Sequence, residues 1–400
     1  MKHAKRWLLY IGVALTPAAS CHSGKQEVIV AKPVLLNTNQ FGDRQNSSSL
    51  PVDGRPDGNV AWEKPSIIAD QSQPALQLAI YDSTLLVSYG SVIDARRLEN
   101  GEPIWHRPIG GSARFDLKPE GLVTLDPAGF YQLLNTDQKL NEPLSLPFLS
   151  SNSVLFYSRR FGDEMLYCYK SIPTPTNSPG DEFGGPNLAL YRFNISTNSF
   201  SWQFHRPENV TGVIESHDGS RIAVATAQNL YLLPADAKSD SAVSIITFPR
   251  LLSCSYDRAG LILVVVELPP EEGGVTLKAI GPDHETTWKL SFGEATVSPQ
   301  PPATSPDGTV YLIVDAKLHC IRSGETIWSV PAPGSTEGNC LTVLKDGTLL
   351  LAAGMTLMHI SSAGSILMNK PLKDTVTCRP IMDARGRIYV AGRHSVTCIE

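Results

Sequence analysis

The chain has 400 residues, of which 42% are hydrophobic and 18% charged, with 31 Gly and 30 Pro. This composition is that of a globular protein rich in turns, and the low charged fraction excludes a long helical or coiled-coil protein. The first 20 residues carry three Lys or Arg and no acidic residue, so 31 basic and 39 acidic residues remain, a formal charge of −8. That acidic balance, without basic runs, speaks against nucleic acid as a partner.

Residues 1–20 have the layout of a secretory signal peptide, with three basic residues before a short apolar run and small residues before Cys21. The run is too short for a stable membrane span. The small residues before the cysteine resemble the lipobox of bacterial lipoproteins. That resemblance implies a lipid on Cys21 as the membrane anchor and, because His22 follows, the periplasmic face of the outer membrane. The alternative is cleavage after Ser20 without a lipid.

Residues 21–56 contain Ser, Asn, Gln and Gly with little periodicity. We predict that this segment is a flexible tether close to the lipid.

From residue 57 to residue 400 one pattern recurs, in which a β-run, a turn, a second β-run, a two-residue hairpin and two further β-runs follow one another. The first turn falls at eight sites with a base period near 40 residues: Ser83, Gly121, Asp163, Gly219, Gly260, Gly308, Gly347 and Gly386. Four short strands per unit of about 40 residues are typical of a propeller blade. The sequence therefore predicts an all-β, eight-bladed β-propeller with four antiparallel strands per blade.

Tryptophans mark the fourth strand, and a turn residue stands four positions before each: Trp62, Trp105, Trp202, Trp288 and Trp328. Large aromatic residues that recur once per blade suit the contact between blades. The last copy stops after its third strand, Ser395–Glu400, whereas the Trp62 unit has no strands before it. We therefore expect residues 58–66 to complete the last blade and to close the ring, which removes two sheet edges.

The block from Asp307 to Trp328 resembles the PQQ-like β-propeller repeat, with its Asp-Gly-x-Val-Tyr and Gly-x-x-x-Trp patterns. Two branches of that family are relevant. The quinoprotein alcohol dehydrogenases carry a vicinal Cys-Cys pair that this chain lacks, so the resemblance does not imply their activity. In length, signal layout, lipid cysteine and blade count, the chain is similar to the eight-bladed lipoprotein of the outer-membrane β-barrel assembly machinery.

A search for catalytic motifs finds no nucleotide-binding loop, no Gly-x-Ser-x-Gly elbow and no His-Glu-x-x-His. We predict neither a catalytic residue, nor a metal, nor a cofactor. Cys340 and Cys378 belong to neighbouring blades, so a disulfide between them is one possibility, and small apolar core residues are the favoured interpretation.

Two connections between second and third strands are enlarged. Residues 171–187 contain Asp181, Glu182 and Phe183, and residues 269–274 contain Glu271 and Glu272. Both insertions rise from the same face of the ring. They represent either neutral loop growth, which surface loops tolerate, or a rim that binds a protein partner.

These observations predict a monomeric, exported, non-catalytic protein of the cell envelope that binds envelope proteins as a scaffold, with outer-membrane protein assembly as the most concrete role. The alternative is an exported enzyme or small-ligand receptor with its site in the central channel.

Overall fold

The computed structural model describes residues 58–66, 74–89, 92–108, 115–118, 121–125, 131–134, 153–161, 163–171, 188–298, 300–333 and 339–400. The chain divides into two compact units, Met1–Lys32 and Pro33–Glu400, and every described residue belongs to the second. The predicted signal peptide and tether, with Cys21, lie outside the described residues. So do Asp181, Glu182 and Phe183.

The first half of the described chain forms sixteen strands and one 3-10 helix, η1 (Asp240–Ala242). The strands are β1 (Val60–Pro65), β2 (Ala75–Tyr81), β3 (Thr84–Tyr89), β4 (Val92–Arg97), β5 (Pro103–Pro108), β6 (Asp116–Lys118), β7 (Gly121–Leu125), β8 (Tyr131–Leu134), β9 (Ser153–Phe161), β10 (Glu164–Ser171), β11 (Leu188–Asn194), β12 (Ser199–Arg206), β13 (Gly212–Glu215), β14 (Arg221–Ala225), β15 (Asn229–Pro234) and β16 (Ser244–Thr247).

The second half forms fifteen strands and the 3-10 helix η2 (Pro270–Glu272). The strands are β17 (Leu251–Tyr256), β18 (Ile262–Glu267), β19 (Val275–Ile280), β20 (Thr286–Gly293), β21 (Ala303–Thr304), β22 (Val310–Val314), β23 (Lys317–Arg322), β24 (Glu325–Pro331), β25 (Asn339–Val343), β26 (Leu349–Ala353), β27 (Thr356–Ile360), β28 (Ile366–Pro371), β29 (Ile381–Met382), β30 (Ile388–Ala391) and β31 (Ser395–Ile399).

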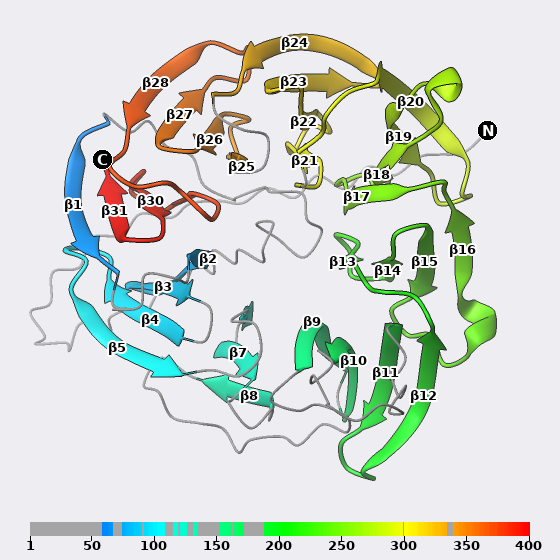
Figure 1. Ribbon diagram of the computed structural model, residues 1–400. Coiled ribbons are helices and arrows are strands. Elements are labelled where there is room, and N and C mark those ends of the chain that lie inside the picture. The colour runs from blue at the N-terminus through cyan, green and yellow to red at the C-terminus, as the bar shows by residue number, and fades with distance from the viewer. Residues whose placement is uncertain are drawn as a thin grey trace, which may run out of the picture. The chain divides into compact units, whose positions relative to one another are not determined.

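These strands form small antiparallel sheets in chain order, as Figure 1 shows. Within the described residues seven sheets have four strands and one has three. We number them by position: sheet 1 is β2–β5, sheet 2 is β6–β8, sheet 3 is β9–β12, sheet 4 is β13–β16, sheet 5 is β17–β20, sheet 6 is β21–β24, sheet 7 is β25–β28, and sheet 8 is β29–β31 with β1. The predicted all-β class and the four-stranded antiparallel unit are confirmed. The fourth strand expected in the second copy, near Asn141, lies outside the described residues.

The predicted closing strand is confirmed, because β1 is hydrogen-bonded to β31 as the outermost strand of sheet 8. Trp62 stands opposite Cys398, and Asn59 and Glu400 exchange two backbone hydrogen bonds of 2.8–2.9 Å. The Lys373 ammonium also binds the Glu63 carboxylate at 2.6 Å. The pairing thus covers an edge of β31 that would otherwise be exposed.

Alternation along each strand places opposite side chains against different neighbouring sheets. In β22, Val310, Leu312 and Val314 pack in a cluster with sheet 5, whereas Tyr311 and Ile313 pack in a cluster with sheet 7. All five side chains are buried. Sheet 6 is therefore covered on both faces by its neighbours, as the propeller prediction requires.

The fourth-strand tryptophans lie at these contacts between sheets, as predicted. A turn residue of the following sheet lies against the preceding tryptophan: a Cβ on Gly101 would meet the Trp62 ring at 2.5 Å, and one on Gly364 would meet Trp328 at 2.8 Å. Positive φ is found at the turn residues that stand four positions before the fourth-strand tryptophans where the structure describes them, including the non-glycine residues Asn198 and His284. The spacing in the sequence therefore reflects a backbone conformation that, at Gly101 and Gly364, places the turn against the tryptophan of the preceding sheet.

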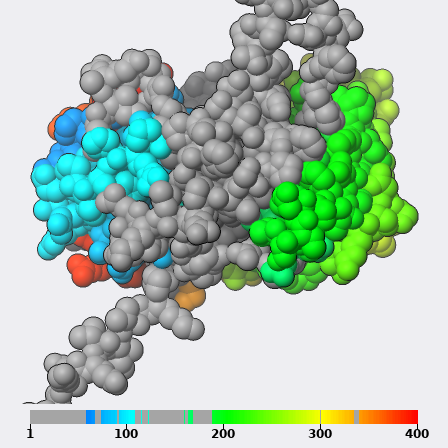
Figure 2. Space-filling view, turned by 90° about the horizontal axis from the view of Figure 1, so that it is seen from below, coloured from blue at the N-terminus to red at the C-terminus, as the bar shows by residue number. Residues whose placement is uncertain are grey.

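The connections of each sheet emerge at two ends. The side that carries the turns between first and second strands and between third and fourth strands, such as residues 305–309 and 361–365, is named the turn face. The hairpin face carries the second-to-third strand connections, such as Asp315-Ala316, where both residues have positive φ as in a tight type I′ hairpin. Figure 2 presents the outer surface of sheet 1 in cyan and of sheets 3 and 4 in green. No helix among the described residues is long and apolar enough to cross a membrane.

Candidate functional site

The insertion after β18 forms a compact acidic loop on the hairpin face. Pro269 and Pro270 start the η2 turn, in which the Glu272 N–H donates to the Pro269 carbonyl at 2.8 Å. Glu271 and Glu272 are both exposed. The structure therefore places these two predicted partner-binding residues together at the tip of one loop. The other predicted loop, with Asp181, Glu182 and Phe183, lies outside the described residues.

Backbone hydrogen bonds hold this acidic loop in one conformation. The Leu268 N–H donates to the Gly274 carbonyl at 2.9 Å, and the Gly293 N–H at the end of β20 donates to Gly273 at 3.2 Å. Gly274 has a φ of +61°, and a Cβ there would collide with the Gly293 carbonyl. Only glycine fits that approach, so the base of the loop is tied to its own sheet.

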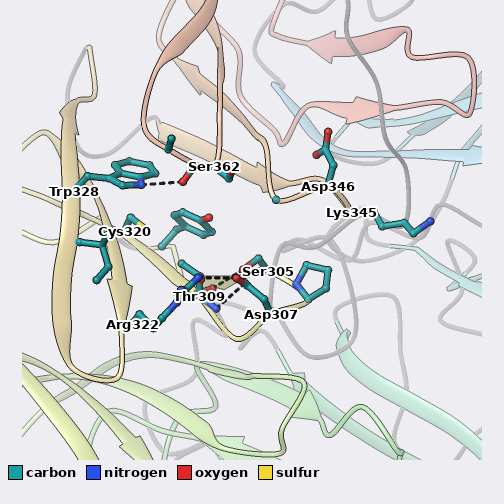
Figure 3. A pocket seen from close by; sticks show the side chains of 14 residues that line it. Ser305, Asp307, Thr309, Cys320, Arg322, Trp328, Lys345, Asp346 and Ser362 are labelled. Atoms are coloured by element: carbon teal, nitrogen blue, oxygen red, sulfur yellow. Dashed lines mark hydrogen bonds and ion pairs between the residues drawn. The ribbon is translucent and has the colours of Figure 1, made fainter.

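A pocket of about 540 Å³ opens between sheets 6 and 7 on the turn face. Figure 3 shows the Trp328 indole on one side and the turn of Ser305 to Thr309 at the opposite wall. The Tyr311 ring also lines the pocket, with its centroid 6.0 Å from that of the indole. Trp328 Nε1 donates to the Ser362 carbonyl at 2.9 Å, so this indole spans the two sheets. Ile327 adds an apolar wall that is 57% exposed.

Charged side chains surround the mouth of the pocket. Arg322 Nη2 binds the Asp307 carboxylate at 2.7 Å and the Thr309 hydroxyl at 2.8 Å. Although burial alone would raise the pKa of Asp307, hydrogen bonds from Ser305 and Thr309 hold it below its ordinary value. Asp346 accepts the Thr348 N–H at 2.9 Å, and in Figure 3 the Lys345 side chain runs away from Asp307 and Trp328. The pocket thus combines aromatic and aliphatic walls with carboxylates at its rim.

The residues of this pocket were not predicted as a site. The sequence assigns Asp307, Tyr311 and Trp328 to turns and blade contacts, because they are members of the repeat. The structure confirms these positions and adds that the three side chains also line a pocket. The only sequence signal is a contrast between repeats, because Thr309 stands where the last repeat has Arg387.

Polar groups on the inner strands are tied to neighbouring elements. Glu215 of β13 pairs with Arg159 of β9 and thereby links sheets 4 and 3. The Thr342 hydroxyl donates to the Pro380 carbonyl at 2.8 Å, between sheets 7 and 8. Among the described residues no His, Cys, Asp or Glu side chains are grouped, three or more together, so as to hold a metal ion.

Six described cysteines are buried free thiols, including Cys340 and Cys378, so the structure supports apolar core residues over the disulfide alternative. Burial raises the pKa of Cys168 and of Cys254 to about 12. The pKa of Cys320, beneath the pocket, rises to about 11, again through burial.

Comparison with known proteins gives structural neighbours but no sequence relatives. No family model matches the chain, and no curated protein sequence matches it. The quinohemoprotein alcohol dehydrogenase from Comamonas testosteroni superimposes with a TM-score of 0.62 at 12% identity, covering 93% of this chain and 81% of that one. A europium-containing methanol dehydrogenase gives 0.58 at 10% identity, covering 88% and 90%. BamB from Moraxella catarrhalis gives 0.51 at 12% identity, covering 84% and 97%.

The chain has the β-propeller fold. Quinoprotein-type dehydrogenases and BamB share it, which supports the resemblance of the repeat to the PQQ-like propeller family. Because the identities are only 10–12%, the similarity to these proteins is evidence for a shared fold and for nothing further. Its function has to be argued from its own residues.

Proposed function

We propose that this propeller is a non-catalytic lipoprotein of the cell envelope that binds other envelope proteins as a scaffold. The observation that carries the proposal is the acidic loop at Glu271 and Glu272, which is exposed at its tip and hydrogen-bonded at its base. A loop fixed in this way loses little freedom when a partner binds, which favours a binding surface over neutral loop growth. Its partner carries a complementary basic surface.

The proposed architecture is an eight-bladed monomer. Seven four-stranded sheets and the three-stranded sheet 2 support this count, with the remaining strand of blade two expected near Asn141. Export, a lipid on Cys21 and a location at the periplasmic face of the outer membrane are supported by the layout of residues 1–21.

Outer-membrane protein assembly is the most concrete form of the scaffold role. The sequence resembles the eight-bladed lipoprotein of that machinery, and the likeness to BamB covers 97% of the BamB chain. The alternative is an exported enzyme or small-ligand receptor with a site in the central channel, and the two dehydrogenases share the fold. The absence of adjacent cysteines from the sequence favours the scaffold.

Site-specific photo-crosslinking in the native envelope tests the scaffold role. A crosslinking amino acid in place of Glu272 should capture a discrete protein, identified by mass spectrometry. The control is the same residue in place of Arg258, which is exposed at the opposite end of the same sheet. Equal capture from both positions, or none from Glu272, would contradict the proposal.

Two glycines offer a matched test of the loop. Gly274→Ala places a Cβ against the Gly293 carbonyl and should release the loop, so capture from position 272 should fall. Gly293→Ala introduces a comparable positive-φ strain, but its Cβ meets nothing within 4 Å, so capture should persist. Deleting residues 173–186 tests the second predicted loop, and that variant should fold but capture less partner. Unchanged capture would remove that loop from the proposal.

A further inference from the structure

Sheets 6 and 8 are near-copies of one another around the pocket position. In sheet 6, Tyr311 stands opposite Cys320, which stands opposite Trp328. In sheet 8, Tyr389 stands opposite Cys398, which stands opposite Trp62. The two rings lie 6.0 Å apart in both sheets, tilted by 45° in sheet 6 and by 50° in sheet 8. The indole N–H of each pair donates to a carbonyl of the following sheet, at Ser362 or at Leu98.

In sheet 8 a guanidinium of the protein itself occupies this aromatic corner. Arg387 lies over the Tyr389 ring at 5.8 Å from the ring centroid. Its Nε donates to the Asp383 carboxylate at 2.8 Å, and its Nη1 reaches the Leu98 carbonyl at 3.4 Å. The Arg387 side chain is 11% exposed, so the corner is closed.

In sheet 6 the residues that would fill the corner are small. Thr309 stands at the position of Arg387, and Ser305 stands at the position of Asp383. The space that Arg387 fills in sheet 8 is therefore part of the pocket between sheets 6 and 7, which has room for more than one side chain.

We propose that this pocket binds an arginine side chain of a protein partner, in the place that Arg387 occupies in sheet 8. The guanidinium lies over the Tyr311 ring and donates to the Ser362 carbonyl and to the Asp307 carboxylate, while its aliphatic stem lies along Ile327 and Trp328. The assignment rests on the proposed scaffold role in one respect only, namely that the arginine belongs to a protein partner.

The charges favour this occupant over others. Of the four charged side chains that line the pocket, Arg322 is paired with Asp307 and Lys345 runs away from Asp307 and Trp328 in Figure 3, so Asp346 disfavours an anionic ligand. A purely apolar ligand would desolvate the Asp307–Arg322 pair and gain no hydrogen bond in return. Arg322 competes for Asp307, but both side chains of that ion pair are 59% exposed, so the pair is weak and can exchange. The acidic balance of the chain also favours a basic partner.

The probe is the tripeptide acetyl-Gly-Arg-Gly-amide, titrated into the full-length protein while the indole N–H resonance of Trp328 is followed by NMR. We expect a saturable shift of that resonance, which Trp328→Phe identifies. The peptide with citrulline in place of arginine lacks the charge and should bind about tenfold more weakly than the arginine peptide. A peptide with leucine at that position should bind no more tightly than the citrulline peptide. Equal binding of the citrulline or leucine peptide, or no binding of the arginine peptide, would overturn the assignment.

Three variants sharpen the test. Asp307→Asn should weaken binding about tenfold, since it removes a charge-assisted acceptor. Arg322→Ala should tighten binding, since it removes the competing guanidinium, and a loss of affinity in this variant would contradict the assignment. The double variant Ser305→Asp with Thr309→Arg rebuilds the sheet 8 arrangement and should abolish binding without lowering the unfolding temperature. If the peptide fails to bind while position 272 still captures its partner, the pocket assignment falls and the scaffold role stands.

Discussion

Arg96 Nη2 donates a hydrogen bond of 2.8 Å to the carbonyl of Pro65, the last residue of the closing strand β1. The same guanidinium holds the Asp94 carboxylate at 2.6 Å, and both side chains are almost fully buried. Burial raises the pKa of Asp94, and the Arg96 charge opposes that rise. A buried ion pair therefore connects sheet 1 to the strand that closes sheet 8.

Removing one partner of this pair should be costly. Arg96→Met leaves the Asp94 carboxylate buried without its counter-charge, and we expect a loss of about 3–5 kcal/mol in the free energy of unfolding, measured by urea titration. The double variant Asp94→Asn with Arg96→Met carries no buried charge and should lose less. A double variant less stable than Arg96→Met would show that the carboxylate is not the source of the loss.

Trp62 should contribute more to stability than any exposed residue of the fourth strands. Trp62→Ala empties a site in the cluster shared by sheets 1, 7 and 8, at an expected cost of about 3–5 kcal/mol. Trp62→Phe should cost about 1 kcal/mol from the hydrogen bond to Leu98, since that carbonyl still accepts the Tyr389 hydroxyl at 3.3 Å. Ile104→Ala, at a 44% exposed position in β5, is the control and should change stability by less than about 0.5 kcal/mol.

Two positive-φ glycines separate backbone strain from steric contact. A Cβ at Gly101 would meet the Trp62 ring at 2.5 Å, whereas a Cβ at Gly260 meets nothing within 4 Å. We expect Gly260→Ala to cost about 1–2 kcal/mol from strain, and Gly101→Ala to cost about 1–3 kcal/mol more from overpacking. Equal unfolding midpoints for the two variants would refute the contact that the structure gives between Gly101 and Trp62.

The turn at Asp218 should make stability depend on pH in the acid range. Hydrogen bonds from Ser216 and Ser220 lower the pKa of this exposed carboxylate from 3.8 to about 2. Because the folded-state pKa lies below the unfolded one, the contribution is complete above about pH 4 and is lost as the pH falls toward about 2. Asp218→Asn should therefore lower the unfolding temperature at neutral pH, and the difference from the unchanged protein should shrink over that interval. A difference that persists at about pH 2 would assign the effect to turn geometry.

The six described thiols should all be free and slow to react. Burial raises the pKa of all six thiols, to about 11 for Cys320 and about 12 for Cys168, Cys254 and Cys398, so almost no thiolate is present at about pH 8, and burial also blocks access. We expect a thiol reagent to modify none rapidly in the folded protein and all six after denaturation without reductant. On prolonged exposure Cys320 should react first, because it lines the pocket between sheets 6 and 7. Four reactive thiols in denaturant would revive the disulfide of Cys340 with Cys378.

Most of the fold could be predicted from local patterns. The turn glycines repeat because hairpins and turns require positive φ. The tryptophans repeat because a large ring fills the contact between sheets in five of the fourth strands, so both leave a trace in the sequence. The addition of residues 58–66 to the last sheet followed from counting strands at the two ends of the pattern. The prediction that Glu271 and Glu272 bind a partner rests on their interruption of that pattern.

The pocket could not be found in this way. The pocket is recognised only by comparing sheet 6 with sheet 8, where Arg387 fills the equivalent space. A threonine at position 309 has no distinguishing feature until the position of Arg387 in three dimensions is known. The buried pair of Asp94 and Arg96 was missed for a similar reason. The sequence shows two alternating charges on a strand that ends near a turn, whereas the structure places both in the core beside the closing strand.

The pairing of β1 with β31 also sets the order in which the protein is completed. Glu63 and Lys373, which meet at this junction, are 310 residues apart in the chain. During synthesis from the N-terminus, β1 emerges first and has no partner until β31 is made, while the sheets between them form from local hairpins. We expect closure to be the slow, non-local step of folding, because it brings together strands separated by most of the chain. Until it occurs, β1 and the edge of β31 are both open to other chains, so this junction is where a newly made molecule is most exposed to mispairing.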